Sequence, residues 1–117
     1  MREEIITTLI NDFLKKPYVD SAMLVTKVGI PLAGRAPQNT QVEIFATMAG
    51  VTYGGAEELI GPPKERLKGI VTDLDGGKRI VLKGLMNLYI LVISVKEYDE
   101  NIKKEIDSFA ETLAKGL

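Results

Sequence analysis

Few positions in the sequence combine the residue type and the spacing that chemistry requires. The stretch TDLDGGK at 72–78 places Asp73 and Asp75 two residues apart, like the first two ligands of a calcium-binding loop. The later ligands and the closing glutamate of such a loop are missing, whereas Asp-Gly-Gly is a strong turn signal. We therefore interpret this stretch as a hairpin turn and predict no metal site.

The remaining candidate groups are weaker still. YGGAEEL at 53–59 has the glycines of a phosphate-binding loop, but it lacks both a preceding strand and a following Lys-Ser/Thr pair. The neighbouring carboxylates Glu57 and Glu58 would point apart on a helix. The sequence contains no cysteine and no histidine, which excludes thiol nucleophiles, Cys/His zinc sites and imidazole bases. We expect a protein that is not an enzyme and that holds no cofactor.

Length and charge point to one domain, over residues 1–117, with no nucleic-acid partner. The net charge is −1, and the lysines and arginines are spread along the chain rather than gathered in one block. The longest apolar run, LYILVISV at 88–95, is too short to cross a bilayer, so we expect no membrane insertion. The N-terminal segment lacks the basic start and apolar core of a secretory signal. The expected location is the cytoplasm.

Hydrophobic periodicity predicts three helices and five strands in the order α-β-β-α-β-β-β-α. Pro17 ends the first helix, Thr40 and Glu43 have the spacing of a capping box for the second, and Asp99 can cap the third. The predicted helices cover 3–16, 40–60 and the segment after Asp99, and the predicted strands cover 21–28, 31–36, 65–73, 78–84 and 87–95.

The strand faces predict how the sheet is ordered. The segments 22–25 and 88–95 are apolar on both faces, which is typical of central strands in a sheet covered on both sides. Placing them side by side gives a five-stranded antiparallel sheet of order 2-1-5-4-3, an α/β (α+β) fold. The strand at 65–73 then forms an edge without an internal proline, open to pairing with another chain, although Lys68 is a mild guard.

The helix at 40–60 carries more apolar surface than one sheet can cover. On a helical wheel the first apolar stripe faces the sheet and a second stripe lies beside it. The first stripe contains Val42, Phe45, Ala46, Ala49, Tyr53, Ala56 and Ile60; the second contains Ile44, Met48, Val51, Leu59 and Gly55. We expect the second stripe to pack against another protein, while a helix broken at Gly54-Gly55 or a merely solvent-wetted stripe are the alternatives.

This pattern, with AMLVTKVGIPLAG early and RIVLKGLMNLYILVISVKEYDENIKKEIDSFAETL late, resembles the Roadblock/dynein light chain family over nearly the whole chain. It is most similar to the stand-alone prokaryotic type, such as the bacterial gliding-polarity GTPase regulators. The resemblance implies that one helix covers one face of the sheet and that the first and last helices cover the other. It also implies that the third strands of two copies pair across a two-fold axis.

The resemblance further implies a homodimer, or a heterodimer with a Roadblock paralogue, that binds a small Ras-like GTPase. Carried onto this sequence, the dimer strand is 67–73 and the partner-facing residues lie on the middle helix. Gly50 and Gly54, at four-residue spacing, are expected to allow close approach of a second chain. The expected dimer interface comprises Leu67, Lys68, Gly69, Ile70, Val71, Thr72, Gly50 and Gly54, and the expected partner-binding residues are Ile44, Met48, Val51 and Gly55.

The leading hypothesis is thus a non-enzymatic dimeric interaction module that regulates or scaffolds a small Ras-like GTPase. The alternative is a small-molecule-sensing α/β/α domain with a ligand pocket between sheet and helix. Such a sensor needs convergent polar groups in its core, and the sequence offers little beyond Thr52, Tyr53 and Tyr89.

Overall fold

A computed structural model describes residues 2–61 and 66–117 of the chain. The helices are α1 (Glu3–Phe13), α2 (Val42–Ile60) and α3 (Glu100–Lys115), with a short 3₁₀ turn η1 (Asp75–Gly77). The strands are β1 (Val19–Thr26), β2 (Pro31–Arg35), β3 (Gly69–Asp73), β4 (Arg79–Leu85) and β5 (Tyr89–Val95). The element order is the one that the sequence predicts.

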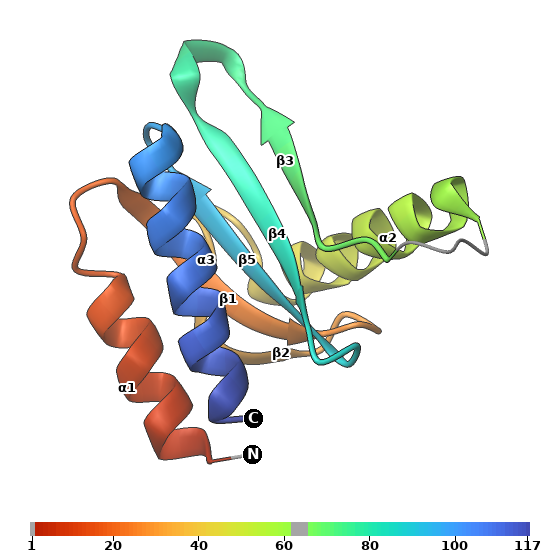
Figure 1. Ribbon diagram of the computed structural model, residues 1–117, viewed down its shortest axis with the longest axis horizontal. Helices are drawn as coiled ribbons and strands as arrows, with labels where there is room; N and C mark the ends of the chain where they lie inside the picture. Colours follow the sequence, from red (N-terminus) through yellow and green to blue (C-terminus); the bar gives the residue numbers. More distant parts are fainter. Residues whose placement is uncertain (1, 62–65) are drawn as a thin grey trace.

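The five strands form one antiparallel sheet of order β2-β1-β5-β4-β3, which confirms the predicted order (Figure 1). In the centre of the sheet Leu24 of β1 lies opposite Leu91 of β5, and at the far edge Val71 of β3 lies opposite Val81 of β4. The two central strands are buried along nearly their whole length. They have apolar residues on both faces because both faces are covered by helices.

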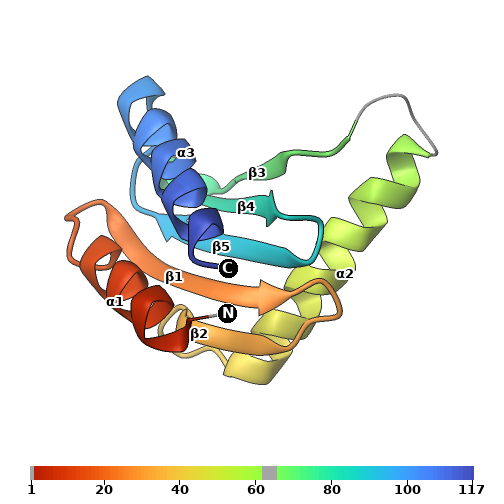
Figure 2. The ribbon, with the colours of Figure 1, turned by 60° about the horizontal axis from the view of Figure 1, so that its bottom comes forward.

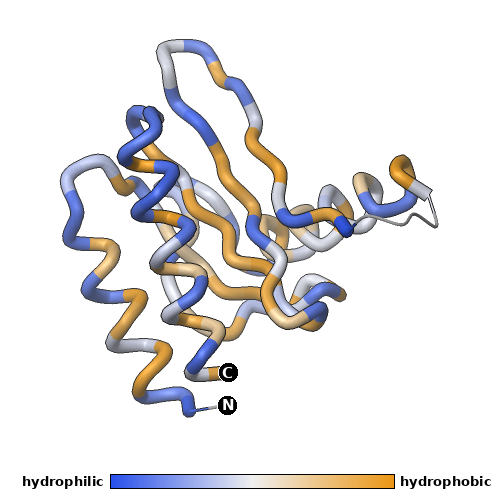
Figure 3. Tube along the Cα trace, viewed as in Figure 1, coloured by the Kyte–Doolittle hydropathy of each residue, from blue (hydrophilic) through white to orange (hydrophobic). Residues whose placement is uncertain are grey.

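The predicted layers are confirmed as well. Helices α1 and α3 cover one face of the sheet, and α2 crosses the other (Figure 2). Each face has its own apolar cluster, and the central strands are drawn mainly as apolar in Figure 3. The α1/α3 cluster is built around Ile6, Ile10, Phe13, Leu24, Leu91, Ile93, Ile106 and Leu113, and the α2 cluster around Met23, Val25, Ala46, Ala49, Tyr53, Leu82, Ile90 and Val92.

The end of α1 differs from the prediction, whereas the start of α3 agrees with it. Helix α1 stops at Phe13 rather than residue 16, because the amides of Lys15 and Lys16 bond only three residues back, to Asp12 and Phe13. Such a tightened last turn is common where a helix runs out of partners. Helix α3 does begin at the predicted cap: the amide of Ile102 donates to Asp99 Oδ1 at 2.8 Å.

The predicted capping box of α2 is wrong. The helix begins at Val42, its N-cap residue is Gln41, and no side chain caps it. The hydroxyl of Thr40 instead contacts the carbonyl of Gln38 within the preceding loop, at 3.5 Å. The capping box would make Thr40 the N-cap residue, so it placed the start of α2 one residue too early.

Helix α2 runs unbroken from Val42 to Ile60, so the alternative of a helix broken at Gly54-Gly55 is wrong. Strand β1 starts at Val19, two residues before its predicted start, and β3 starts only at Gly69. The first predicted residue of that strand, residue 65, lies outside the described residues. Within 2–61 and 66–117, no helix has both the length and the apolar character to cross a membrane.

Candidate interaction surfaces

Strand β3 forms an open edge of the sheet, as predicted. Its even-numbered residues face β4: the Lys68 carbonyl accepts from the Gly84 amide, and the Leu74 amide donates to the Lys78 carbonyl, each at 3.1 Å. The hydroxyl of Thr72 bonds to both backbone groups of Ile80. Backbone groups alternate sides along an antiparallel strand. Those of Gly69, Val71 and Asp73 are therefore directed to the free side.

The side chains along this edge do little to block a second strand. Val71 is half exposed, and within the described residues no strand lies beyond β3 in the sheet. Asp73 pairs with Arg79 on the neighbouring strand at 3.0 Å, so its charge is held within the hairpin. Lys68 is exposed but precedes the strand. An exposed strand edge without proline is a template for backbone pairing.

The outer face of α2 is apolar and exposed. Ala46, Ala49 and Tyr53 are buried on the side of the helix that faces the sheet. Ile44, Met48 and Val51 project roughly opposite to them and are 56%, 51% and 59% exposed. Gly55, the fourth predicted partner-facing residue, is also exposed. The four predicted residues thus form one continuous surface, which we call the outer stripe.

The three glycines of α2 have different surroundings, and for Gly50 the expectation needs correction. A Cβ at Gly50 would lie 3.0 Å from the carbonyl of Lys27 and 3.1 Å from the amide of Gly29. The close approach that this glycine permits is therefore made by the β1–β2 turn of its own chain, and Gly50 is buried there. Gly54 is half-buried and Gly55 exposed, and a Cβ at either would meet no described atom within 4 Å.

The C-terminal end of α2 extends past the sheet, a feature that sequence reasoning missed. Val42 and Ile60, assigned to the buried stripe, are 40% and 46% exposed, and Leu59 is 88% exposed. Among residues 54–61, all of which the structure describes, none is buried. In Figure 1 the last turns of α2 project beyond β3, and Figure 3 shows an apolar tip. A helical wheel gives the direction of a side chain but not where the sheet ends.

Tyr53 is the last buried residue of α2 and ties the helix to the β3 side of the sheet. Its hydroxyl donates to the Leu67 carbonyl at 2.8 Å. A Cβ on Gly84 of β4 would overlap this hydroxyl, so the glycine makes room for the tyrosine. Burial raises the pKa of the Tyr53 phenol, and the charge of Glu57 raises it further. The phenol therefore stays neutral and remains a hydrogen-bond donor.

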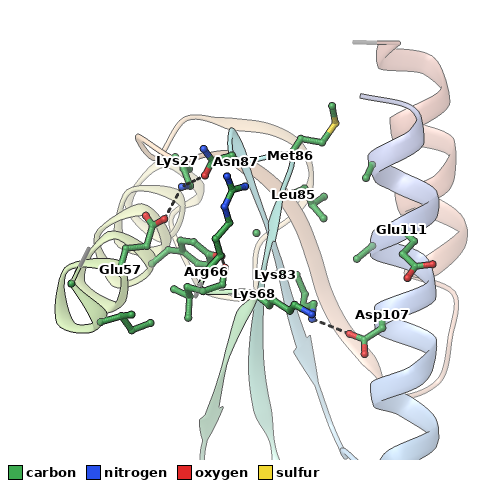
Figure 4. Close-up of a pocket in the computed structure, with 17 residues that line it drawn as sticks. Lys27, Glu57, Arg66, Lys68, Lys83, Leu85, Met86, Asn87, Asp107 and Glu111 are labelled. Carbon is green, nitrogen blue, oxygen red and sulfur yellow. Dashed lines mark hydrogen bonds and ion pairs between the residues drawn. The ribbon is translucent and has the colours of Figure 1, made fainter. Parts of the chain in front are cut away.

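Lys27, which directly follows β1, also holds the C-terminal half of α2 against the sheet; we call Tyr53 and Lys27 with their contacts the anchor of α2. Its ammonium contacts Glu57 Oε2 of α2 at 2.8 Å and Asn87 Oδ1 of the β4–β5 turn at 3.1 Å (Figure 4). The same ammonium lies 5.7 Å from the centroid of the Tyr53 ring, within cation–π range. These contacts bring three segments that are distant in sequence to one point.

An open groove of about 1010 Å³ runs past this anchor. It wraps around the end of β4, with Glu57 of α2 on one side and Asp107 of α3 on the other (Figure 4). Two of its lysines are paired within the chain, Lys27 with Glu57 and Lys83 with Asp107 at 3.0 Å. The groove lies beside α2 and the end of β4 but is open, whereas the sensor alternative requires a pocket enclosed in the core. The hydroxyl of Tyr53, which that alternative would use, is bonded to Leu67.

On the α1/α3 face, a small polar cluster joins the two helices to the start of β1. Lys16 and Tyr18 both donate to Glu105 Oε1 at 2.9 Å. Both hydrogen bonds lower the pKa of the Glu105 carboxyl, and the one from Lys16 has the larger effect. Burial raises the pKa of Tyr18 well above its usual range, and the hydrogen bond to Glu105 raises it further.

Among the residues that the structure describes, no cluster of three or more acidic side chains could hold a metal ion.

Comparison with known proteins gives structural matches but no sequence matches. No protein-family model matches the chain, and no curated protein matches its sequence. Among solved structures, an MglB in a tetrameric arrangement superposes with a TM-score of 0.83 at 18% identity, covering 97% of this chain and 88% of that one. MglB of Myxococcus xanthus gives 0.80 at 16% identity with the same coverage.

A Roadblock/LC7 domain from Streptomyces avermitilis superposes with a TM-score of 0.76 at 15% identity, over 94% of this chain and 92% of that domain. Identities this low establish similarity of fold and leave function to be argued from surfaces. The chain has the fold of stand-alone prokaryotic Roadblock/LC7 proteins, as its sequence predicts.

Proposed function

We propose that the protein is a non-enzymatic interaction module that pairs with a second copy through β3 and binds a small Ras-like GTPase through the outer stripe of α2. One observation supports this above all others: a single chain leaves both an unpaired strand edge and an apolar helix face exposed. Monomeric proteins rarely expose both. The class of the partner comes from the family that the sequence resembles.

The self-association half of the proposal follows from β3. Antiparallel pairing of two identical edge strands requires a two-fold axis perpendicular to the sheet. This axis keeps equivalent faces on the same side, so both α2 helices lie on one face of a ten-stranded sheet. The interface would then use the dimer strand 67–73, paired through the outward backbone groups of β3, and, where the two α2 helices approach, Gly54.

The overhanging end of α2 fits the same arrangement. Because the last turns of α2 project beyond β3, in the pair they would lie above the sheet of the second copy. Leu59 and Ile60, exposed in one chain, would be covered there. Ile70 and Ile80 are only partly buried on that face of the sheet and supply an apolar surface to receive them. Burial of such side chains contributes about 25 cal/mol per Å² of apolar area.

The partner-binding half follows from the outer stripe. Ile44, Met48 and Val51 point away from the chain's own sheet, so pairing through β3 leaves them accessible. Two such stripes on one face give a broad apolar surface without a buried charge or nucleophile. A surface of this kind acts on a partner by its shape, either holding it or favouring one of its conformations. We place the GTPase there.

Two variants test the outer stripe. Val51→Asp places a charge at the centre of the stripe and should weaken GTPase binding roughly tenfold to a hundredfold, as for a central interface residue. Leu88→Asp is the matched control, because Leu88 is 61% exposed on the β4–β5 turn, similar to Val51. Binding and GTP hydrolysis would be measured with small GTPases of the same genome. If no candidate GTPase binds or changes its rate, the partner half is wrong.

A third variant tests self-association. Val71→Pro removes an amide that is directed to the free side of β3 rather than to β4, so it should abolish pairing between copies while sparing the hairpin. Sizing at micromolar concentration should show a dimer for the unmodified chain and a monomer for this variant. A monomeric unmodified chain would rule out pairing.

A further inference from the structure

The free edge of β3 ends where Tyr53 meets it. Gly69, Val71 and Asp73 direct backbone groups to the free side, and by alternation Leu67 would be the next residue in that row. The carbonyl of Leu67 instead accepts the hydrogen bond of Tyr53, and the strand begins only at Gly69. The chain's own helix therefore occupies the group that would have extended the row.

This arrangement limits how two copies can pair. With three outward residues, the two-fold axis that uses all of them passes through Val71. Val71 of one copy then lies opposite Val71 of the second, and Gly69 lies opposite Asp73. If the carbonyl of Leu67 were free, the row would be longer, and pairing centred on residue 70 would match Leu67 with Asp73 and use one more pair. The two registers differ by one residue in their centre.

We infer that Tyr53 is a positioning residue that fixes the register of self-pairing at Val71 by holding the carbonyl of Leu67. The inference rests on the proposed pairing through β3 and adds its geometry. The Tyr53–Leu67 hydrogen bond also requires glycine at position 84, because any side chain there would displace the hydroxyl of Tyr53. Moving the axis by one residue changes the partner of every residue by two, so each side chain keeps its face and one copy slides along the other by about 7 Å. Tyr53 therefore also decides how the two outer stripes are placed relative to each other.

Disulfide cross-linking tests the register directly, because the chain has no cysteine of its own. Val71→Cys places two thiols opposite each other across the proposed axis, within the Cα separation that a disulfide accepts. Ile70→Cys is the reporter for the alternative centre. In the otherwise unmodified chain, Val71→Cys should form a disulfide-linked dimer readily and Ile70→Cys should not.

The second step adds Tyr53→Phe, which removes the hydroxyl and keeps the ring. It should lower the cross-linking of Val71→Cys by about fivefold, the ratio expected for loss of one hydrogen bond, and raise that of Ile70→Cys. Gly84→Ala should also lower the cross-linking of Val71→Cys and raise that of Ile70→Cys, because its methyl group would displace the hydroxyl of Tyr53 from the carbonyl of Leu67. Tyr89→Phe is the matched control, since Tyr89 packs in the α1/α3 cluster on the other face. Thermal unfolding of each variant confirms that it remains folded.

The outcomes separate the two claims. If sizing shows a dimer in which Ile70→Cys cross-links and Val71→Cys does not, the register is wrong although pairing stands. If Tyr53→Phe leaves both yields unchanged, Tyr53 does not set the register. If neither cysteine variant cross-links and the chain is a monomer, the proposed pairing itself fails.

Discussion

Replacing the glycines of α2 by alanine should change the free energy of unfolding in opposite directions at neighbouring sites. Replacing glycine by alanine inside a helix gains about 1 kcal/mol from backbone entropy when the new methyl group has room. Gly54 and Gly55 have that room, because no described atom lies within 4 Å of a Cβ at either position. We expect Gly54→Ala and Gly55→Ala each to raise the free energy of unfolding by about 1 kcal/mol.

Gly50→Ala should behave differently because the β1–β2 turn stands in the way. The new methyl group would lie 3.0–3.3 Å from the backbone of Lys27 and Gly29, closer than ordinary contact. Two hydrogen bonds hold the turn: the amide of Gly29 donates to the carbonyl of Thr26 at 2.9 Å, and the amide of Lys27 donates to the carbonyl of Leu88 at 3.1 Å. The backbone of the turn therefore moves little to make room. Overpacking costs about 1–3 kcal/mol, which exceeds the helix gain. We expect a net loss of about 1 kcal/mol.

The assay is urea or thermal unfolding of all three variants, repeated at several protein concentrations because self-association adds stability. A difference of about 2 kcal/mol between Gly54→Ala and Gly50→Ala corresponds to roughly 8 °C in Tm for a chain of this size. Equal stabilisation by Gly50→Ala and Gly54→Ala would refute the argument, since it would mean that the turn does not press on the helix. A Gly54→Ala chain that is more stable yet pairs less well would place Gly54 in the interface between copies.

Four further predictions concern stability. Asp99→Ala removes the side chain that caps α3 and should lower the free energy of unfolding by about 1 kcal/mol in urea titration; an unchanged value would mean that the cap is dispensable. The hydroxyl of Ser21 is buried with no hydrogen-bond partner among the described residues, so Ser21→Ala should raise stability by about 1 kcal/mol, whereas the exposed control Ser108→Ala should have little effect. The lowered pKa of Glu105 means that the folded state favours its carboxylate, so the associated stability is present above the unfolded pKa and is lost as pH falls through the folded pKa. Glu105→Gln should accordingly flatten the acid side of the stability profile relative to the control Glu111→Gln, and an unchanged slope would contradict this. For Tyr18, whose folded pKa is raised, the sign reverses: Tyr18→Phe should reduce the loss of stability above about pH 10.

Local sequence was sufficient for most of the fold. Helix α3 was predictable because its apolar period and its Asp99 cap act within a few residues, and the sheet order was predictable because 88–95 and 22–25 are apolar on both faces. The outer stripe and the open edge were also predictable, since each is an excess of apolar or unpaired surface that a single chain cannot hide. Boundaries were less predictable where they depend on hydrogen bonds several residues away, as at the start of α2.

The tertiary structure alone decided what meets each residue. A wheel placed Gly50 among small residues suited to close approach, but only the folded chain shows that its own turn makes the contact. The same wheel placed Tyr53 in the core without revealing that its hydroxyl reaches Leu67 at the sheet edge. Helical periodicity fixes the direction of a side chain, whereas the position of α2 across the sheet depends on contacts between segments far apart in sequence. Local patterns therefore determined which surfaces this protein must cover, and packing decided which of them its own chain covers.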